Sequence, residues 1–162
     1  MQLVAIINPI SGHSSKSVAN NNIFSLVDTE LFNVSIEITQ FPGHATELAK
    51  KAVAEGVDVV VAVGGDGTVN EVAKALVGTS TILGIIPCGS GNGLARHLHI
   101  PMDTKKAVQI INEGDVVSID SMTVNGIPCF CTMGVGYDAK VSEEYAKEST
   151  RGFITYARKF IE

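Results

Sequence analysis

A repeating order of short apolar runs and longer amphipathic segments constrains the fold most strongly. The runs that are typical of strands are residues 3–7, 33–39, 57–63 and 81–87. The segments with helical spacing are residues 17–27, 44–56, about 69–77, and 103–114. Because strand and helix alternate along the chain, the sequence predicts an α/β fold with a doubly wound parallel sheet and right-handed crossovers.

The pattern changes after the last of these helices, for which Asp103 or Thr104 is the expected N-cap. Two β-type stretches follow at 115–126 and 127–136, and Asn125 with Gly126 is a strong hairpin turn signal between them. The sequence therefore predicts an antiparallel β domain that begins near residue 115.

The predicted organisation is a nucleotide-binding domain at 1–114 and an incomplete, β-rich second domain at 115–162. Two antiparallel strands do not form an independent core, and the helical pattern that ends at Glu162 lacks a stop signal. We therefore expect the chain to be part of a longer protein.

Charge and composition exclude several classes of protein. The net charge is −5 and the lysines and arginines are scattered, whereas a nucleic-acid binder needs a concentrated basic surface. No apolar run reaches the roughly 18 to 20 residues of a membrane span, and the first residues do not resemble a signal peptide. These features predict a cytoplasmic protein without a transmembrane segment, whose 3 cysteines are reduced.

The first of three glycine-containing loops is "NPISGHSSK" at 8–16, directly after the first strand. Ser11 and Gly12 allow a tight turn whose amides can face an anion. The loop lacks the G-K-[ST] ending of the common P-loop. An ordinary strand-to-helix turn remains the alternative.

The second loop, "GGDGT" at 64–68, lies between an apolar strand and a helix. Adjacent glycines let backbone approach a bulky ligand, and the helix directs its positive dipole end at the loop. Asp66 would repel a phosphate unless a magnesium ion or a hydroxyl donor lies between them. In the alternative interpretation, Asp66 caps the helix through the amide of Thr68 or Val69.

The third loop, "PCGSGNGLAR" at 87–96, again follows a strand. Its G-x-G-x-G spacing misses the dinucleotide fingerprint G-x-G-x-x-G, which disfavours an NAD-dependent oxidoreductase. Ser90 and Asn92 offer a hydroxyl and an amide to a phosphate or a ribose, or they cap the next turn.

In this order and spacing, "NPISG", "GGDGTVNEV" and "PCGSGNGLAR" resemble the catalytic domain of the diacylglycerol kinase and sphingosine kinase superfamily, including its bacterial lipid kinases. Residues 131–141, "CTMGVGYDAKV", resemble the start of that family's second domain. The resemblance implies a fold like that of NAD kinase and phosphofructokinase, and ATP-dependent transfer of the γ-phosphate to the hydroxyl of a diacylglycerol-like or sphingoid lipid, with Mg²⁺. It further implies a role in phospholipid biosynthesis and a lipid substrate at the membrane surface, and leaves peripheral membrane association and homo-oligomerisation open.

The resemblance also implies an ATP site. The residues it assigns to the nucleotide are Asn8, Ser11, Thr46, Gly64, Gly65, Asp66, Gly67, Thr68, Glu71 and Ser90. Asp66 is the implied catalytic and metal-binding residue. In the resembled family the general base and further metal ligands lie in an acidic, glycine-containing motif of the C-terminal domain, which this chain lacks. We therefore expect this chain alone to bind nucleotide weakly or to turn over poorly.

Two other functions stay open. An NAD kinase shares the "GGDGT" segment, although the first and third motifs fit lipid kinases better. A non-catalytic nucleotide-binding regulator is consistent with the missing acidic motif. Gly93 stands where diacylglycerol kinases often carry an acid and sphingosine kinases often alanine, so the acceptor lipid is undecided. His97 and His99 are weak metal-ligand candidates without cysteines at zinc spacing.

Overall fold

The computed structural model describes residues 1–11, 23–130 and 133–147. The chain divides into two compact units, Met1–Phe130 and Cys131–Glu162. In the second unit the described element is α6 (Tyr137–Lys147). The rest of the helical pattern expected at the end of the sequence, 148–162, lies outside the described residues. The loops and strands of interest all belong to the first unit.

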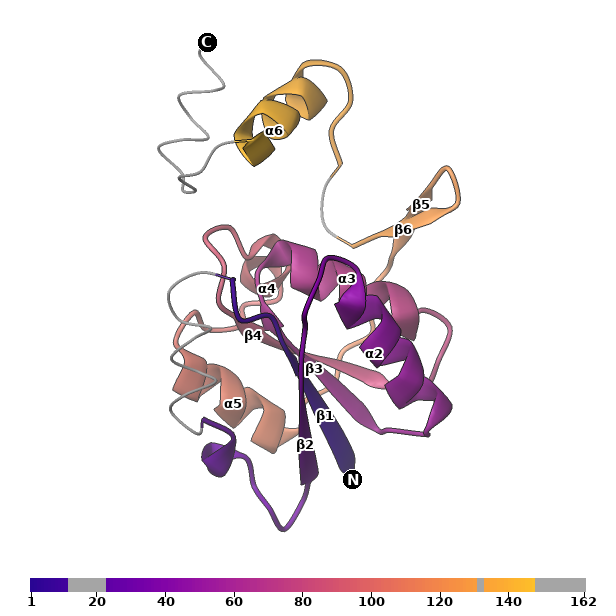
Figure 1. Ribbon diagram of the computed structural model, residues 1–162. Coiled ribbons are helices and arrows are strands. Elements are labelled where there is room, and N and C mark those ends of the chain that lie inside the picture. The colour runs from indigo at the N-terminus through magenta and orange to yellow at the C-terminus, as the bar shows by residue number, and fades with distance from the viewer. Residues whose placement is uncertain (12–22, 131–132, 148–162) are drawn as a thin grey trace. The chain divides into compact units, whose positions relative to one another are not determined.

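A four-stranded parallel sheet forms the centre of the first unit (Figure 1). Its strands are β1 (Gln2–Ile7), β2 (Asn33–Ile38), β3 (Val59–Gly64) and β4 (Ile82–Pro87). They lie in the order β2-β1-β3-β4. In this register, Leu3 pairs with Val34 of β2 on one side and with Val59 of β3 on the other. This arrangement confirms the predicted α/β fold with a parallel sheet.

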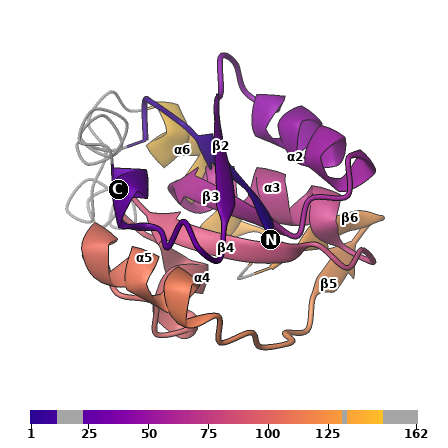
Figure 2. The ribbon, with the colours of Figure 1, turned by 90° about the horizontal axis from the view of Figure 1, so that it is seen from below.

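Helices cover both faces of the sheet (Figure 2). On one face lie α2 (His44–Ala54), α3 (Asp66–Leu76) and the short α4 (Gly93–His97). On the other face lie α5 (Thr104–Glu113) and the chain around the 3₁₀ turn η1 (Ile23–Leu26). The sheet is therefore doubly wound.

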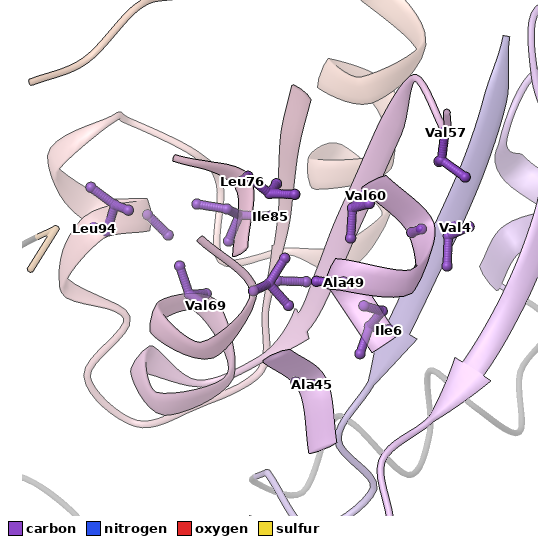
Figure 3. Close-up of a cluster of buried hydrophobic side chains, with 14 residues drawn as sticks. Val4, Ile6, Ala45, Ala49, Val57, Val60, Val69, Leu76, Ile85 and Leu94 are labelled. Carbon is purple, nitrogen blue, oxygen red and sulfur yellow. The ribbon is translucent and has the colours of Figure 1, made fainter. Parts of the chain in front are cut away.

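The central strands are buried on both faces, which explains their continuous apolar sequences. All six residues of β3 and five of the six in β1 are buried. On the α2 and α3 face, Val4, Ile6 and Val60 pack against the alanines and valines of the two helices (Figure 3). Each large apolar side chain buried in this way stabilises the fold by about 1.5–3 kcal/mol. The sheet is thus a rigid base for the loops at its edge.

Two expected helices differ from the structure. Of the predicted helix 17–27, residues 12–22 lie outside the described residues, and 23–26 form a 3₁₀ turn and not an α-helix. The helix expected at 69–77 is α3, which begins three residues earlier, at Asp66. The "GGDGT" loop therefore contains the first turn of α3, with Gly65 as its N-cap.

The predicted β-type stretches at 115–126 and 127–136 are much shorter in the structure. They pair as β5 (Met122–Val124) and β6 (Ile127–Cys129), with positive φ at Asn125 and Gly126 as a type I′ hairpin requires. Residues 115–121 form no regular element, because β-type residues make a strand only beside a partner. The hairpin belongs to the first unit, so the unit boundary follows residue 130, whereas the sequence places the second domain from 115.

Candidate functional site

The carboxyl ends of the four strands are tied to one another by backbone hydrogen bonds. The amide of Thr39 donates to the carbonyl of Ile7 at 2.9 Å, and that of Asn8 donates to the carbonyl of Val63 at 3.0 Å. The amide of Cys88 donates to Gly64 at 2.8 Å. The connection that follows β1 leads to β2 on one side of it, whereas the connection that follows β2 leads to β3 on the other side of β1. The strand order therefore reverses beside β1, and ligands bind at such a topological switch point, at the carboxyl ends of the strands.

Asn8 and Ser11 of the first loop meet Thr68 of the second. The Asn8 Nδ2 donates to the Thr68 Oγ1 at 3.1 Å, while the Asn8 Oδ1 accepts from the amide of Ile10 at 3.1 Å. The Ser11 Oγ lies 3.5 Å from the same Thr68 hydroxyl, which is 4% exposed. The structure therefore brings Asn8 and Ser11 to Thr68, which lies 60 and 57 positions away from them in sequence.

The first turn of α3 presents backbone donors at this edge. Its N-cap is Gly65 and no side chain caps it, so the first amides of the helix lack an acceptor within it. A Cβ built on Gly67 would have no heavy atom within 4 Å, which means that this turn faces open space. The eleven-residue helix directs its positive dipole end toward the same space. This turn is suited to hold an anion.

Asp66 joins the second loop to the third. Its Oδ2 accepts from the amide of Asn92 at 2.8 Å, and its Oδ1 accepts from the amide of Gly93 at 2.6 Å. The alternative in which Asp66 caps its own helix through Thr68 or Val69 is therefore wrong. The two amides partly offset the carboxylate's charge, which lowers its repulsion of a neighbouring anion. Each carboxylate oxygen keeps a second lone pair for a cation.

The second and third loops also touch backbone to backbone. A Cβ on Gly89 would lie 2.6 Å from the Cα of Gly65, and one on Gly91 would lie 2.7 Å from the Asp66 Oδ2. Both distances are too short for a side chain. The glycines of "PCGSGNG" thus allow the two loops to come into contact, as close approach of backbones requires.

Asn92 holds the third loop in shape, and its amide is not free for a phosphate or ribose as the sequence suggested. Its Oδ1 accepts from the amide of Gly89 at 3.0 Å and its Nδ2 donates to the carbonyl of Gly89 at 2.7 Å. Its backbone has φ 54°, a conformation that asparagine tolerates better than most residues. An asparagine between two glycines is the sequence signal for this role. The Arg96 Nε, which donates to the carbonyl of Gly91 at 2.8 Å, is a further contact within the third loop.

The remaining predicted site residues are placed as follows. Thr46 lies in the first turn of α2, and its hydroxyl donates to the carbonyl of Glu71 in α3 at 2.9 Å. This bond gives Thr46 a role in helix packing. Glu71 is half-buried, and Ser90 is exposed on the third loop. Cys88 is 4% exposed and packs in the core beside that loop.

Replacing Thr46 with valine tests this packing role. We expect Thr46→Val to lower the free energy of unfolding by about 1 kcal/mol, because one partly buried hydrogen bond is lost at nearly constant shape. Thr81→Val is the matched control: the Thr81 hydroxyl donates to the carbonyl of Val57 at 2.9 Å, between the amino ends of the strands. Urea titration measures the free energy of unfolding of both variants. Equal stability of Thr46→Val and the wild type would contradict the role.

Among the described residues, no helix has the length and apolar content to cross a membrane.

Comparison with known proteins identifies the family of this chain. The diacylglycerol kinase catalytic domain matches residues 2–124. The chain is 33% identical over 154 residues to the lipid kinase YegS of Escherichia coli K12, an alignment that covers 91% of this chain and 52% of that protein. It is also 34% identical over 154 residues to an uncharacterized protein of Synechocystis, covering 88% of this chain and 35% of that one.

Solved structures agree. A crystal structure of a diacylglycerol kinase from Bacillus anthracis superposes with a TM-score of 0.67 at 27% identity, over 78% of this chain and 47% of the other. The chain spans about half the length of the lipid kinases it matches. The matched region contains all three glycine loops. The chain therefore belongs to the diacylglycerol kinase catalytic domain family.

Proposed function

We propose that this chain carries the nucleotide-binding part of an ATP-dependent lipid kinase, which transfers the γ-phosphate to the hydroxyl of a diacylglycerol-like or sphingoid lipid. The observation that carries the proposal is the uncapped first turn of α3, open at Gly67 and fixed to the third loop by Asp66. Membership of a kinase family supports ATP as the phosphate donor.

The donor set of the site fits a magnesium-bound triphosphate. Backbone amides at a helix N-terminus bind phosphate oxygens, and the Asp66 carboxylate supplies the oxygen ligands that Mg²⁺ prefers. When bound, the ion neutralises part of the phosphate charge. A carboxylate in the phosphate-binding turn then attracts the metal-bound ligand, although it would repel the free phosphate.

Phosphoryl transfer depends mostly on positioning and charge stabilisation, so the chain's own residues have defined tasks. The first-turn amides of α3 hold the phosphates. Asn8 and Ser11 hold the Thr68 hydroxyl in the same turn, and Ser90 and Glu71 border the site from the third loop and from α3. We place the lipid acceptor at a membrane surface, with the kinase bound peripherally on the cytoplasmic side.

A thermal unfolding series tests the nucleotide. A ligand at about 100 times its dissociation constant stabilises a fold by roughly 2.7 kcal/mol, so we expect Mg²⁺ with ATP to raise the Tm and NAD to leave it unchanged. A rise with NAD alone would favour an NAD kinase-like enzyme. No rise with either nucleotide would contradict the proposal.

Phosphate transfer tests the acceptor. In mixed micelles that contain diacylglycerol or sphingosine, radiolabelled ATP reports which lipid takes the phosphate. We expect this chain to transfer little, since it spans about half of its relatives, and the chain extended to the length of those relatives to transfer to one lipid. Nucleotide binding without transfer in the extended protein would favour a non-catalytic regulator.

A further inference from the structure

An aromatic pair with an exposed Phe41 and a half-buried His44 lies where the turn after β2 enters α2. The rings of Phe41 and His44 are stacked, with centroids 4.5 Å apart and an interplanar angle of 16°. Phe41 is 50% exposed although one side of its ring is against the imidazole. The solvent-accessible surface therefore includes a flat aromatic face. We propose that this face of Phe41 stacks on the purine base of the bound nucleotide, an inference that rests on the proposed function.

Local hydrogen bonds fix the pair. The amide of Gln40 donates to the His44 Nδ1 at 3.1 Å, which sets the ring's orientation and makes Nδ1 an acceptor. The amide of His44 donates to the carbonyl of Phe41 at 3.2 Å, and Gly43 turns the chain between them with φ 90°. The platform is thus largely ordered before a ligand arrives, so that little conformational entropy is lost on binding.

The turn lies on the edge of the sheet that carries the phosphate-binding loops. The bond from Thr39 to Ile7 joins it to the end of β1, and the bond from Asn8 to Thr68 joins the end of β1 to α3. The Thr46 hydroxyl, two residues after His44, is bonded to α3 as well. The pair therefore lies beside the first loop and on the face of the sheet that α2 and α3 cover.

The spacing of the sheet suits a nucleotide that lies across this edge. Neighbouring strands are about 4.8 Å apart, so the ends of β2 and β3 are separated by roughly 10 Å. An extended nucleotide that places its phosphates on the first turn of α3 and runs over the end of β1 carries its base to the end of β2. Phe41 is the aromatic residue that meets it there.

Stacking predicts a specific pattern of affinities. A base stacked on an aromatic side chain contributes about 1–3 kcal/mol, which corresponds to roughly 5- to 150-fold in affinity. Purines have the larger aromatic surface, so ATP and GTP should bind more tightly than CTP and UTP. Inorganic tripolyphosphate, which has no base, should bind independently of Phe41.

Calorimetry with ATP and tripolyphosphate separates this inference from the proposed function. For Phe41→Leu we expect ATP affinity to fall about 5- to 150-fold, with tripolyphosphate affinity unchanged. Leu31→Ala is the control, since Leu31 is 48% exposed in the turn at the amino end of β2. Unchanged ATP binding in Phe41→Leu would overturn the stacking and leave the nucleotide site intact. If the wild type binds neither compound, the proposed function and the stacking both fail.

A tryptophan at the same position gives a second, optical test. The chain has no tryptophan, so Phe41→Trp contains a single indole, and it should keep ATP affinity at the wild-type value or above. We expect ATP to quench its fluorescence and tripolyphosphate to leave it unchanged. Equal fluorescence with saturating ATP and with tripolyphosphate would show that the base does not reach this ring.

Discussion

Gly89→Ala is expected to separate the second and third loops and to weaken nucleotide binding. The new Cβ would lie 2.6 Å from the Cα of Gly65, and because that neighbour is backbone, no side-chain rotation can relieve the contact. Overpacking of this kind costs about 1–3 kcal/mol, so the Tm should fall by roughly 2–12 °C for a chain of this size. ATP affinity should fall at least about 10-fold, equivalent to 1.4 kcal/mol.

Gly67→Ala is the matched stability control in the same pair of loops. A Cβ there meets nothing within 4 Å, and Gly67 lies inside α3. Alanine is the better helix former by about 0.5–1 kcal/mol, so this variant should be as stable as the wild type or more so. Differential scanning calorimetry on both variants measures the difference. If Gly89→Ala and Gly67→Ala have the same Tm, the second and third loops do not lie as close together as the 2.6 Å distance from a Gly89 Cβ to the Gly65 Cα implies.

Asp66→Ala is the second variant with a large expected effect. It removes the acceptors of the Asn92 and Gly93 amides, and hydrogen bonds to a charged group contribute about 1.5–3 kcal/mol when buried. Asp66 is exposed, so water replaces part of that contribution, and we expect a loss of about 1–2 kcal/mol in the free energy of unfolding. Affinity for ATP in the presence of Mg²⁺ should fall about 10-fold or more.

The magnesium dependence distinguishes a binding role from a purely structural one. Asp66→Asn removes the charge together with one of the two acceptors for the Asn92 and Gly93 amides, so the diagnostic quantity is the ratio of the ATP affinities with and without Mg²⁺, which should be smaller than in the wild type. Asp58→Ala is the control: the Asp58 Oδ2 accepts from the amide of Gln2 at 2.6 Å at the other edge of the sheet. That variant should lose stability and keep its ATP affinity. Equal magnesium dependence in Asp66→Asn and the wild type would restrict Asp66 to joining the loops.

The sheet could be predicted from the sequence because its signals are local. The central strands β1 and β3 are buried on both faces, so that each appears as an uninterrupted apolar run, and Asp103 and Gly114 mark the ends of α5. For a related reason, the sequence predicts longer strands over 115–136 than β5 and β6, which the structure forms there. Their β-type residues need a partner strand, and Val117, which is 69% exposed, has none among the described residues.

The candidate site was predictable in position and not in detail. The glycines after β1, β3 and β4 locate it, since strand ends of a parallel sheet share an edge. The partners of Asp66 lie 26 and 27 residues away, and Asn8 meets Thr68 across 60 residues. Such pairs depend on how the loops pack, which no local pattern encodes. Asp66 accepts from these distant amides and not from those of its own helix, so a capping pattern read from the neighbouring residues predicts the wrong partners.

Backbone amide NMR of this 162-residue chain tests most directly the claim that the three glycine loops form one nucleotide site. On titration with Mg²⁺ and ATP, we expect chemical-shift changes to concentrate at residues 8–11, 64–68 and 89–93. The amino edge of the sheet, around Asp58 and Thr81, should stay unchanged. Changes confined to that opposite edge, or to one loop without the other two, would contradict the account.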